Sequence, residues 1–163
     1  DLLSNQLSEN SFKTKILRTF PELSYFSSNV SSQRDQTVCA MLTVLWLISG
    51  DHQAFTRSQP EDDHLTKHSW GWIKEWMTET VRLTYEEAVD AILVFMAIHA
   101  LGKIPEFREE LAPGYDASMH DVALAQILID QAQFVPSFSR LAPRYQRLIV
   151  DSLSVDFQFS QFL

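Results

Sequence analysis

Cysteine, glycine and basic residues are scarce in this chain. The single cysteine, Cys39, excludes an intrachain disulfide, so packing must hold the fold together. A chain with one cysteine is compatible with a reducing and with an oxidising compartment. Four glycines among 163 residues leave little material for hairpin turns. The 13 basic residues are outnumbered by 21 acids, giving a formal charge of −8, which argues against binding a nucleic-acid duplex through its phosphates.

Long apolar runs are also missing. The longest, Val38 to Ile48 and Ala91 to Ile98, are shorter than the ~20 residues of a bilayer span, so we expect no membrane contact and a soluble protein, with the cytoplasm favoured. The chain opens with Asp1, and no basic-then-apolar leader follows, which indicates a processed or excised piece of a longer protein.

Apolar residues make up 45% of the chain and recur at spacings of three and four, which is typical of helices. We therefore predict an all-α protein: a single helical domain of about six to eight helices. Residues 1–36 are expected to form an N-terminal helix and loop. Residues 37–163 are expected to form the helical domain, which could be truncated at its C-terminus.

Start and stop signals place the individual helices. Proline favours the first turn of a helix, an acid or hydroxyl can cap that turn, and glycine favours the position after the last turn. By these rules we expect helices at Asp35 to Ser49 (buried, closed by Gly50), Pro60 to Arg82, Thr84 to Leu101 (opened by a capping box) and Ser118 to Phe134. We expect a short amphipathic turn at Pro105 to Leu111 and a tail divided into short helices by Pro136 and Pro143.

Histidines provide the candidate functional residues. His99 ends an apolar helix and needs a partner for its imidazole, either a backbone carbonyl or a metal ion. His64 lies one helical turn before His68, so the two could share a face. Near His68, Trp72 and Trp76 are expected in the core. Trp70 is a core residue or a contact for a substrate ring.

The segment from Ile98 to Ile104, IHALGKI, resembles the central signature of the HD-domain metal-dependent phosphohydrolases, in which an apolar helix ends in His-Asp followed by Leu or Ile, Gly and Lys. Lys67-His68-Ser69 is similar to the family's first ligand, and Met119-His120-Asp121 lies where many members place a further one. The resemblance covers about residues 64–156.

This resemblance implies an HD-type helical domain and a metal-dependent hydrolase. His68, His99 and His120 would hold one or two divalent ions (Mn, Fe, Zn, Ni or Co), which turn water into hydroxide near neutral pH. The implied substrate is small and phosphorylated: a phosphomonoester, a nucleotide or a cyclic nucleotide, the last cleaved as by a phosphodiesterase. The family's late Asp ligand would be Asp156, with Asp151 or a residue beyond Leu163 as alternatives.

One position departs from the family. Ala100 stands where the family has the Asp of its His-Asp pair, and a methyl group cannot bridge metal ions. The alanine is either natural, in a member that has lost activity, or an engineered substitution that traps an inactive enzyme. Both explanations predict negligible hydrolysis by the chain as given.

Two more residues have open roles. Lys103 either contacts a substrate phosphate as a catalytic group or is a solvated cation at a helix end. Asp121 is a ligand, an acceptor that fixes an imidazole tautomer, or an acid favoured by the helix dipole. The alternatives to a phosphohydrolase are a non-catalytic helical interaction module and an HD-type di-iron oxygenase.

Overall fold

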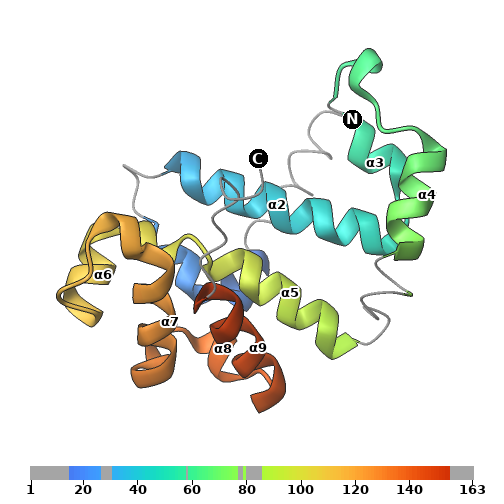
Figure 1. The fold of residues 1–163 in the computed structure, drawn as a ribbon. Coiled ribbons are helices and arrows are strands. Elements are labelled where there is room, and N and C mark those ends of the chain that lie inside the picture. The colour runs from blue at the N-terminus through green and yellow to red at the C-terminus, as the bar shows by residue number, and fades with distance from the viewer. Residues whose placement is uncertain (1–14, 27–30, 58, 77–78, 80–85, 155–163) are drawn as a thin grey trace, which may run out of the picture.

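The computed structural model describes residues 15–26, 31–57, 59–76, 79 and 86–154. Within these ranges every regular element is helical and no strand occurs, so the all-α prediction is confirmed (Figure 1). About nine helices are present in the described part, slightly more than expected.

Short and long helices alternate along the chain. Residues 15–19 are helical and lead into the first 3-10 turn. The α-helices are α2 (Ser31–Ser49), α3 (His52–Thr56), α4 (Lys67–Glu75), α5 (Glu86–Ile98), α6 (Pro105–Leu111), α7 (His120–Asp130), α8 (Pro136–Ser139) and α9 (Pro143–Ser154). The 3-10 turns are η1 (Pro21–Tyr25), η3 (Glu61–Asp63), η5 (Leu101–Lys103), η6 (Ala117–Met119) and η7 (Ala132–Phe134).

Helix α5 is the centre of the packing. It contacts α2 on one side and α8, α9 and η1 on the other, while α7 packs against α9 and η5. Figure 1 shows this order, with α2 above α5 and the helices α6 to α9 at the opposite side. Ala97 and Ile98 of α5 and Ile127 of α7 are fully buried there. Burial of these apolar side chains is the main force that assembles the helices.

The N-terminal segment belongs to the same core. Ile16, Phe20, Leu23 and Phe26 are buried in one cluster with the side chains of α5 and α7. Among the described residues, the boundary expected after residue 36 therefore does not separate two cores.

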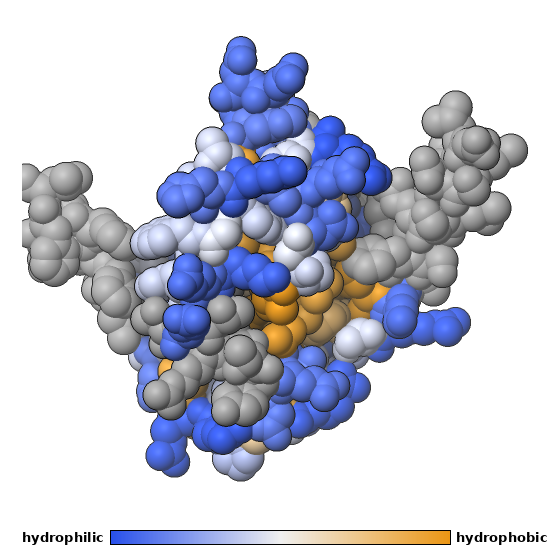
Figure 2. Space-filling view, turned by 90° about the vertical axis from the view of Figure 1, so that its right-hand side faces the viewer, coloured by the Kyte–Doolittle hydropathy of each residue, from blue (hydrophilic) through white to orange (hydrophobic). Residues whose placement is uncertain are grey.

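Helix α2 begins at Ser31, four residues before the predicted start, and is less buried than its apolar composition suggests. Among its described side chains, only Thr37, Met41 and Val44 are buried. Figure 2 shows apolar side chains gathered between hydrophilic margins on the side of the molecule where α3 and α4 lie. Gly50 closes the helix at φ 75°, the left-handed position predicted for it.

The predicted helix from Pro60 to Arg82 is wrong in its first part. Glu61–Asp63 is a 3-10 turn, and His64 is extended (ψ 124°). A new helix then starts because the Thr66 hydroxyl accepts a hydrogen bond from the Ser69 N–H at 3.1 Å. His64 is therefore outside the helix that carries His68. The predicted helix end and the Thr84 capping box lie outside the described residues.

The structure confirms the core position allowed for Trp70 and contradicts the core positions expected for Trp72 and Trp76. Trp70 is 5% exposed and packs on the Phe55 ring, with the centroids 4.7 Å apart, whereas Trp72 is 63% and Trp76 49% exposed. Trp70 faces inward because it meets α3, the short helix that precedes it in the chain. A pair spaced by four marks one face of a helix but does not say which way that face points.

The later elements follow their proline signals. The short turn expected at Pro105 to Leu111 is the helix α6 with those bounds, and Pro136 and Pro143 begin α8 and α9. The helix predicted from Ser118 to Phe134 is divided into η6, α7 and η7. Asp116, instead of Ser118, caps its start by accepting the Ser118 N–H at 2.7 Å.

No single helix in the described ranges has the length and apolar composition of a membrane span. Residues 86–103 and 105–111 satisfy that criterion only as a pair, and they are bent by 86° relative to each other.

Candidate functional site

His99 follows the last turn of α5 and is half-buried. Its Nδ1 atom lies 2.8 Å from the carbonyl oxygen of Met96, and its ring centroid lies 6.1 Å from that of Phe95. The sequence left two partners open for this imidazole, a backbone carbonyl or a metal ion. The structure supplies the carbonyl.

His120 begins α7 and lies beside the turn that follows His99. Its Nδ1 atom is 3.1 Å from the Ala117 carbonyl oxygen, and its Nε2 atom is 3.4 Å from Asp121 Oδ1. The backbone of Gly102 lies very close to His120, since a Cβ added at Gly102 would be only 2.1 Å from the His120 carbonyl oxygen. Two of the landmarks that carry the HD resemblance therefore contact each other.

His68 is exposed on α4, and Figure 1 shows α4 and α7 at opposite ends of the molecule. In the described part of the chain, no three His, Cys, Asp or Glu side chains lie close enough together to hold a metal ion. His68, His99 and His120 thus do not fit one metal shell in this arrangement. Asp156 lies outside the described residues, and Asp151 is exposed on α9. The metal site stays a prediction from the sequence.

Ala100 has no exposed surface and belongs to the hydrophobic core. Two candidate site residues near it differ from it: His99 is half-buried and Lys103 is exposed. Asp121, the other candidate catalytic residue, is exposed in the first turn of α7 beside His120. An acid in that first turn is stabilised by the helix dipole, which is one of the three roles the sequence allowed.

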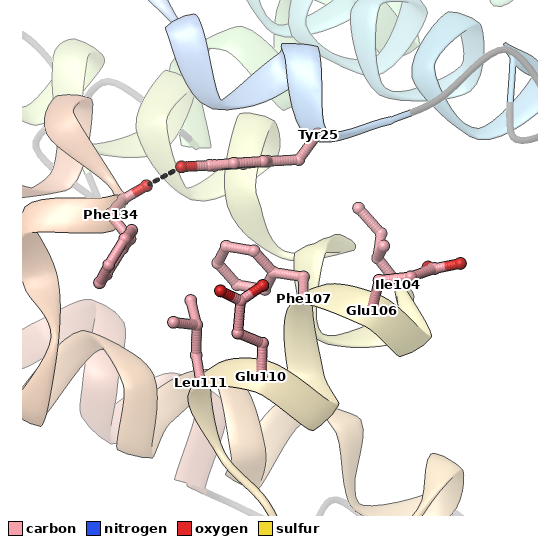
Figure 3. A pocket seen from close by; sticks show the side chains of 7 residues that line it. All are labelled: Tyr25, Ile104, Glu106, Phe107, Glu110, Leu111 and Phe134. Carbon is pink, nitrogen blue, oxygen red and sulfur yellow. Dashed lines mark hydrogen bonds between the residues drawn. The ribbon is translucent and has the colours of Figure 1, made fainter.

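A pocket of about 410 Å³ lies elsewhere, where η1, α6 and η7 meet (Figure 3). Three aromatic rings line it, from Tyr25, Phe107 and Phe134. The Tyr25 and Phe107 centroids are 5.0 Å apart, and the Tyr25 hydroxyl donates a hydrogen bond to the Phe134 carbonyl oxygen at 3.1 Å. This hydrogen bond fixes one wall of the pocket relative to the other.

Acidic side chains from α6 complete the lining. Glu106 and Glu110 are one helical turn apart, and Figure 3 shows the Glu110 carboxylate beside the Phe107 ring and the Glu106 carboxylate pointing away from the three rings. Arg108, the basic residue of the same helix, points inward: its side chain is buried and donates to the carbonyl oxygens of Gly102 at 3.0 Å and Tyr115 at 3.2 Å. The open face of α6 therefore carries negative charge.

Sequence reasoning missed this pocket. The amphipathic pattern of Pro105 to Leu111 signals that Phe107 faces inward, and it places Glu106 and Glu110 near the surface. No local pattern connects these residues with Tyr25 or Phe134, because the three segments meet only after the chain has folded.

Comparison with known families gives one result. Residues 23–163 match a family described as a family of unknown function (DUF6829). The chain belongs to this family. The DUF6829 match includes the complete lining of the pocket as well as the candidate histidines. Neither the curated proteins nor the solved structures gave a match.

Proposed function

We propose that this chain is a non-catalytic helical binding module. The observation that carries the proposal is the position of Ala100. Its side chain is 0% exposed, as are those of its neighbours Ile98 and Leu101, and all three belong to the hydrophobic core.

A carboxylate at this position would be costly. An ionised group loses its hydration when it is buried, and without a cation or hydrogen-bond donors that loss is not compensated. The apolar surroundings of Ala100 suit a methyl group. This favours a natural alanine over an alanine that replaces a metal-binding Asp.

The positions of the histidines support the same proposal. His99 Nδ1 has a backbone partner at 2.8 Å, and His120 Nδ1 has one at 3.1 Å, so each imidazole has a hydrogen bond that does not involve a metal ion. His68 is on a helix at the far end of the molecule. A binding module needs none of these imidazoles to converge.

The alternative is the HD-type phosphohydrolase that the sequence resemblance implies. The contact between Gly102 and His120 favours it, because it brings the Leu-Gly-Lys turn against the start of α7. Hydrolysis would require divalent ions at His68, His99 and His120, and the described arrangement does not bring these three side chains together. One pair of variants separates the two functions.

The decisive comparison is Ala100→Asp against Ala97→Asp. Ala97, three residues earlier in the last turn of α5, is also 0% exposed, and the resemblance assigns it no metal. For a binding module, both variants lose roughly 2–5 kcal/mol of unfolding free energy, and neither regains it with Mn²⁺, Fe²⁺ or Zn²⁺. If a metal ion raises the melting temperature of Ala100→Asp alone, and this variant hydrolyses phosphoesters, the assignment as a binding module is wrong.

The unchanged protein provides a measurement that does not depend on folding of these variants. After dialysis against Mn²⁺ or Zn²⁺, we expect elemental analysis to show no stoichiometric metal. Stoichiometric binding that His99→Ala abolishes would instead support the phosphohydrolase.

A further inference from the structure

We propose that the pocket between η1, α6 and η7 binds an alkylated ammonium group, such as that of choline or of trimethyl-lysine. This inference rests on the proposed binding function, because it names the class of ligand that the module takes.

The aromatic walls are the first reason. Tyr25, Phe107 and Phe134 come from three different elements, and their rings surround one hollow (Figure 3). The face of an aromatic ring is negative and attracts a cation that approaches within about 6 Å of its centre. Tyr25 and Phe134 are 38% and 40% exposed, so their rings are open to a ligand from solvent.

The second reason is the charge at the pocket. In the described part of the chain, neither Glu106 nor Glu110 has a hydrogen-bonding or ion-pair partner for its carboxylate. Like charges one helical turn apart repel each other, so a cation held beside Glu110 weakens an unfavourable interaction within α6. Complementary charge also discriminates against neutral and anionic ligands.

The pocket favours an alkylated ammonium over a primary one. A primary ammonium carries three N–H donors that need acceptors once water is removed. The acceptors among the lining side chains are the Glu106 and Glu110 carboxylates. The aromatic rings, Ile104 and Leu111 offer apolar surface, and the Phe134 carbonyl oxygen already accepts the Tyr25 hydroxyl. Methyl groups on the nitrogen replace those donors with apolar surface that matches the walls, while the positive charge is kept.

The size of the pocket leaves room for more than the ammonium group. Its volume of about 410 Å³ lies in the range of small-ligand sites. A short neutral chain attached to the nitrogen fits this description. A phosphate on that chain would face Glu106 and Glu110, so phosphocholine is expected to bind more weakly than choline.

The first experiment measures ligand affinity with the whole chain by NMR titration. The probes are choline, phosphocholine and 3,3-dimethylbutan-1-ol, a neutral molecule of similar shape to choline. We expect choline to bind roughly tenfold more tightly than the neutral molecule, a difference of about 1.4 kcal/mol. Equal affinities would overturn the proposal, since the pocket would then select apolar shape and not charge.

A second titration distinguishes a free small molecule from a modified protein side chain. Acetylated, amidated trimethyl-lysine is compared with the same derivative of unmodified lysine, and both with choline. Tighter binding of the trimethyl-lysine derivative than of choline identifies a protein partner, and the reverse order identifies a small molecule. Binding of unmodified lysine as tight as that of trimethyl-lysine contradicts the preference for alkylation.

Variants locate the binding site. Glu110→Gln and Phe134→Leu should each weaken choline binding by roughly fivefold to tenfold. Glu109→Gln is the matched control, because it removes the same charge from an exposed residue of α6 that does not line the pocket. Phe134→Tyr keeps an aromatic ring and should retain binding. If Glu109→Gln weakens binding as much as Glu110→Gln, the effect comes from overall charge and the pocket is not the site.

Failure of this inference is distinct from failure of the proposed function. Loss of choline binding leaves the comparison of Ala100→Asp with Ala97→Asp unchanged, so only the ligand class is rejected. A metal-dependent gain in Ala100→Asp rejects the non-catalytic module, whatever the pocket binds.

Discussion

At the scale of single residues, the Glu22 carboxyl stands out because it is buried and acidic. It is 1% exposed; Oε1 accepts a hydrogen bond from the Ser137 hydroxyl, and Oε2 has no partner in the described part of the chain. Burial raises the pKa of Glu22 above its ordinary value of 4.5, against the opposing effects of backbone N–H groups and of the Arg140 charge.

This raised pKa predicts a pH effect on stability. The folded protein takes up the Glu22 proton at a higher pH than the unfolded chain does. The stabilisation from the protonated group is therefore complete below about 4.5 and is lost as pH rises through the folded-state pKa. Glu22→Gln stays neutral at every pH. We expect the melting temperature of the variant, relative to the unchanged protein, to be highest near neutral pH and to fall as the solution is acidified.

Thermal unfolding followed by circular dichroism across this pH range provides the measurement. Asp116 must be considered beside it, because hydrogen bonds from Ser118 lower its pKa, and its contribution to stability is lost in acid. That residue is the same in both proteins, so its effect cancels in the difference. A difference in melting temperature that does not change with pH would contradict the prediction.

At the scale of elements, the close contact between η5 and α7 depends on a missing side chain. A Cβ at Gly102 would lie 2.1 Å from the His120 carbonyl oxygen and 2.9 Å from its carbon, whereas a Cβ at Gly71 meets no atom within 4 Å. Gly102→Ala should therefore push η5 away from α7 and cost roughly 1–3 kcal/mol of unfolding free energy. Gly71 lies inside α4, where alanine should add roughly 0.5–1 kcal/mol.

Chemical denaturation of the two glycine variants tests this prediction, since the same substitution is expected to act with opposite signs. Equal effects would mean that helix propensity alone, and not the contact with His120, determines the result.

The elements differ in how well the sequence predicts them. Pro105, Pro136 and Pro143 each begin a helix, because proline fits a first helical turn by its own geometry. The proline-acid start at Pro60 instead produces a 3-10 turn, because Thr66 offers a competing cap a few residues later. Local chemistry thus predicts where a helix can start, and competition between nearby signals determines where it does start.

The candidate site shows the same limit more strongly. The HD-like segment from Ile98 to Ile104 contains a turn that the structure places against α7. One sequence cannot say whether the elements that carry His68 and His120 come together. The pocket was not predicted, since Tyr25 and Phe134 belong to segments with no common pattern. Both questions depend on packing between distant segments.

At the scale of the whole molecule, the segment 15–26 packs against the last third of the chain and is hydrogen-bonded to it. Arg140 donates a hydrogen bond to the Thr19 carbonyl oxygen at 2.8 Å, and η1 packs against α8. Phe20 and Leu23 of this segment are buried in the common core. Without it, the corresponding apolar surface of α5 and α8 would be open to water.

Truncation tests the importance of this segment. A chain of residues 27–163 should lose its near-ultraviolet circular dichroism and its cooperative thermal transition, because the core loses Ile16, Phe20, Leu23 and Phe26 together. A chain of residues 15–163 keeps all four and serves as the reference. Cooperative unfolding of both chains at the same temperature would show that the N-terminal segment is dispensable.

The hydrogen bond between Tyr25 and Phe134 also has a consequence for the order of folding. It joins residues 109 positions apart, and the contact between Glu22 and Ser137 spans 115. Contacts of such sequence separation form late, because a long loop must be closed before they contribute. During synthesis, η1 leaves the ribosome long before α8 exists, so its apolar side chains cannot pack against α8 until that helix has been made. The pocket is thus completed only after α6 and η7 have been synthesised, and occupancy by a ligand would report that these distant segments have come together.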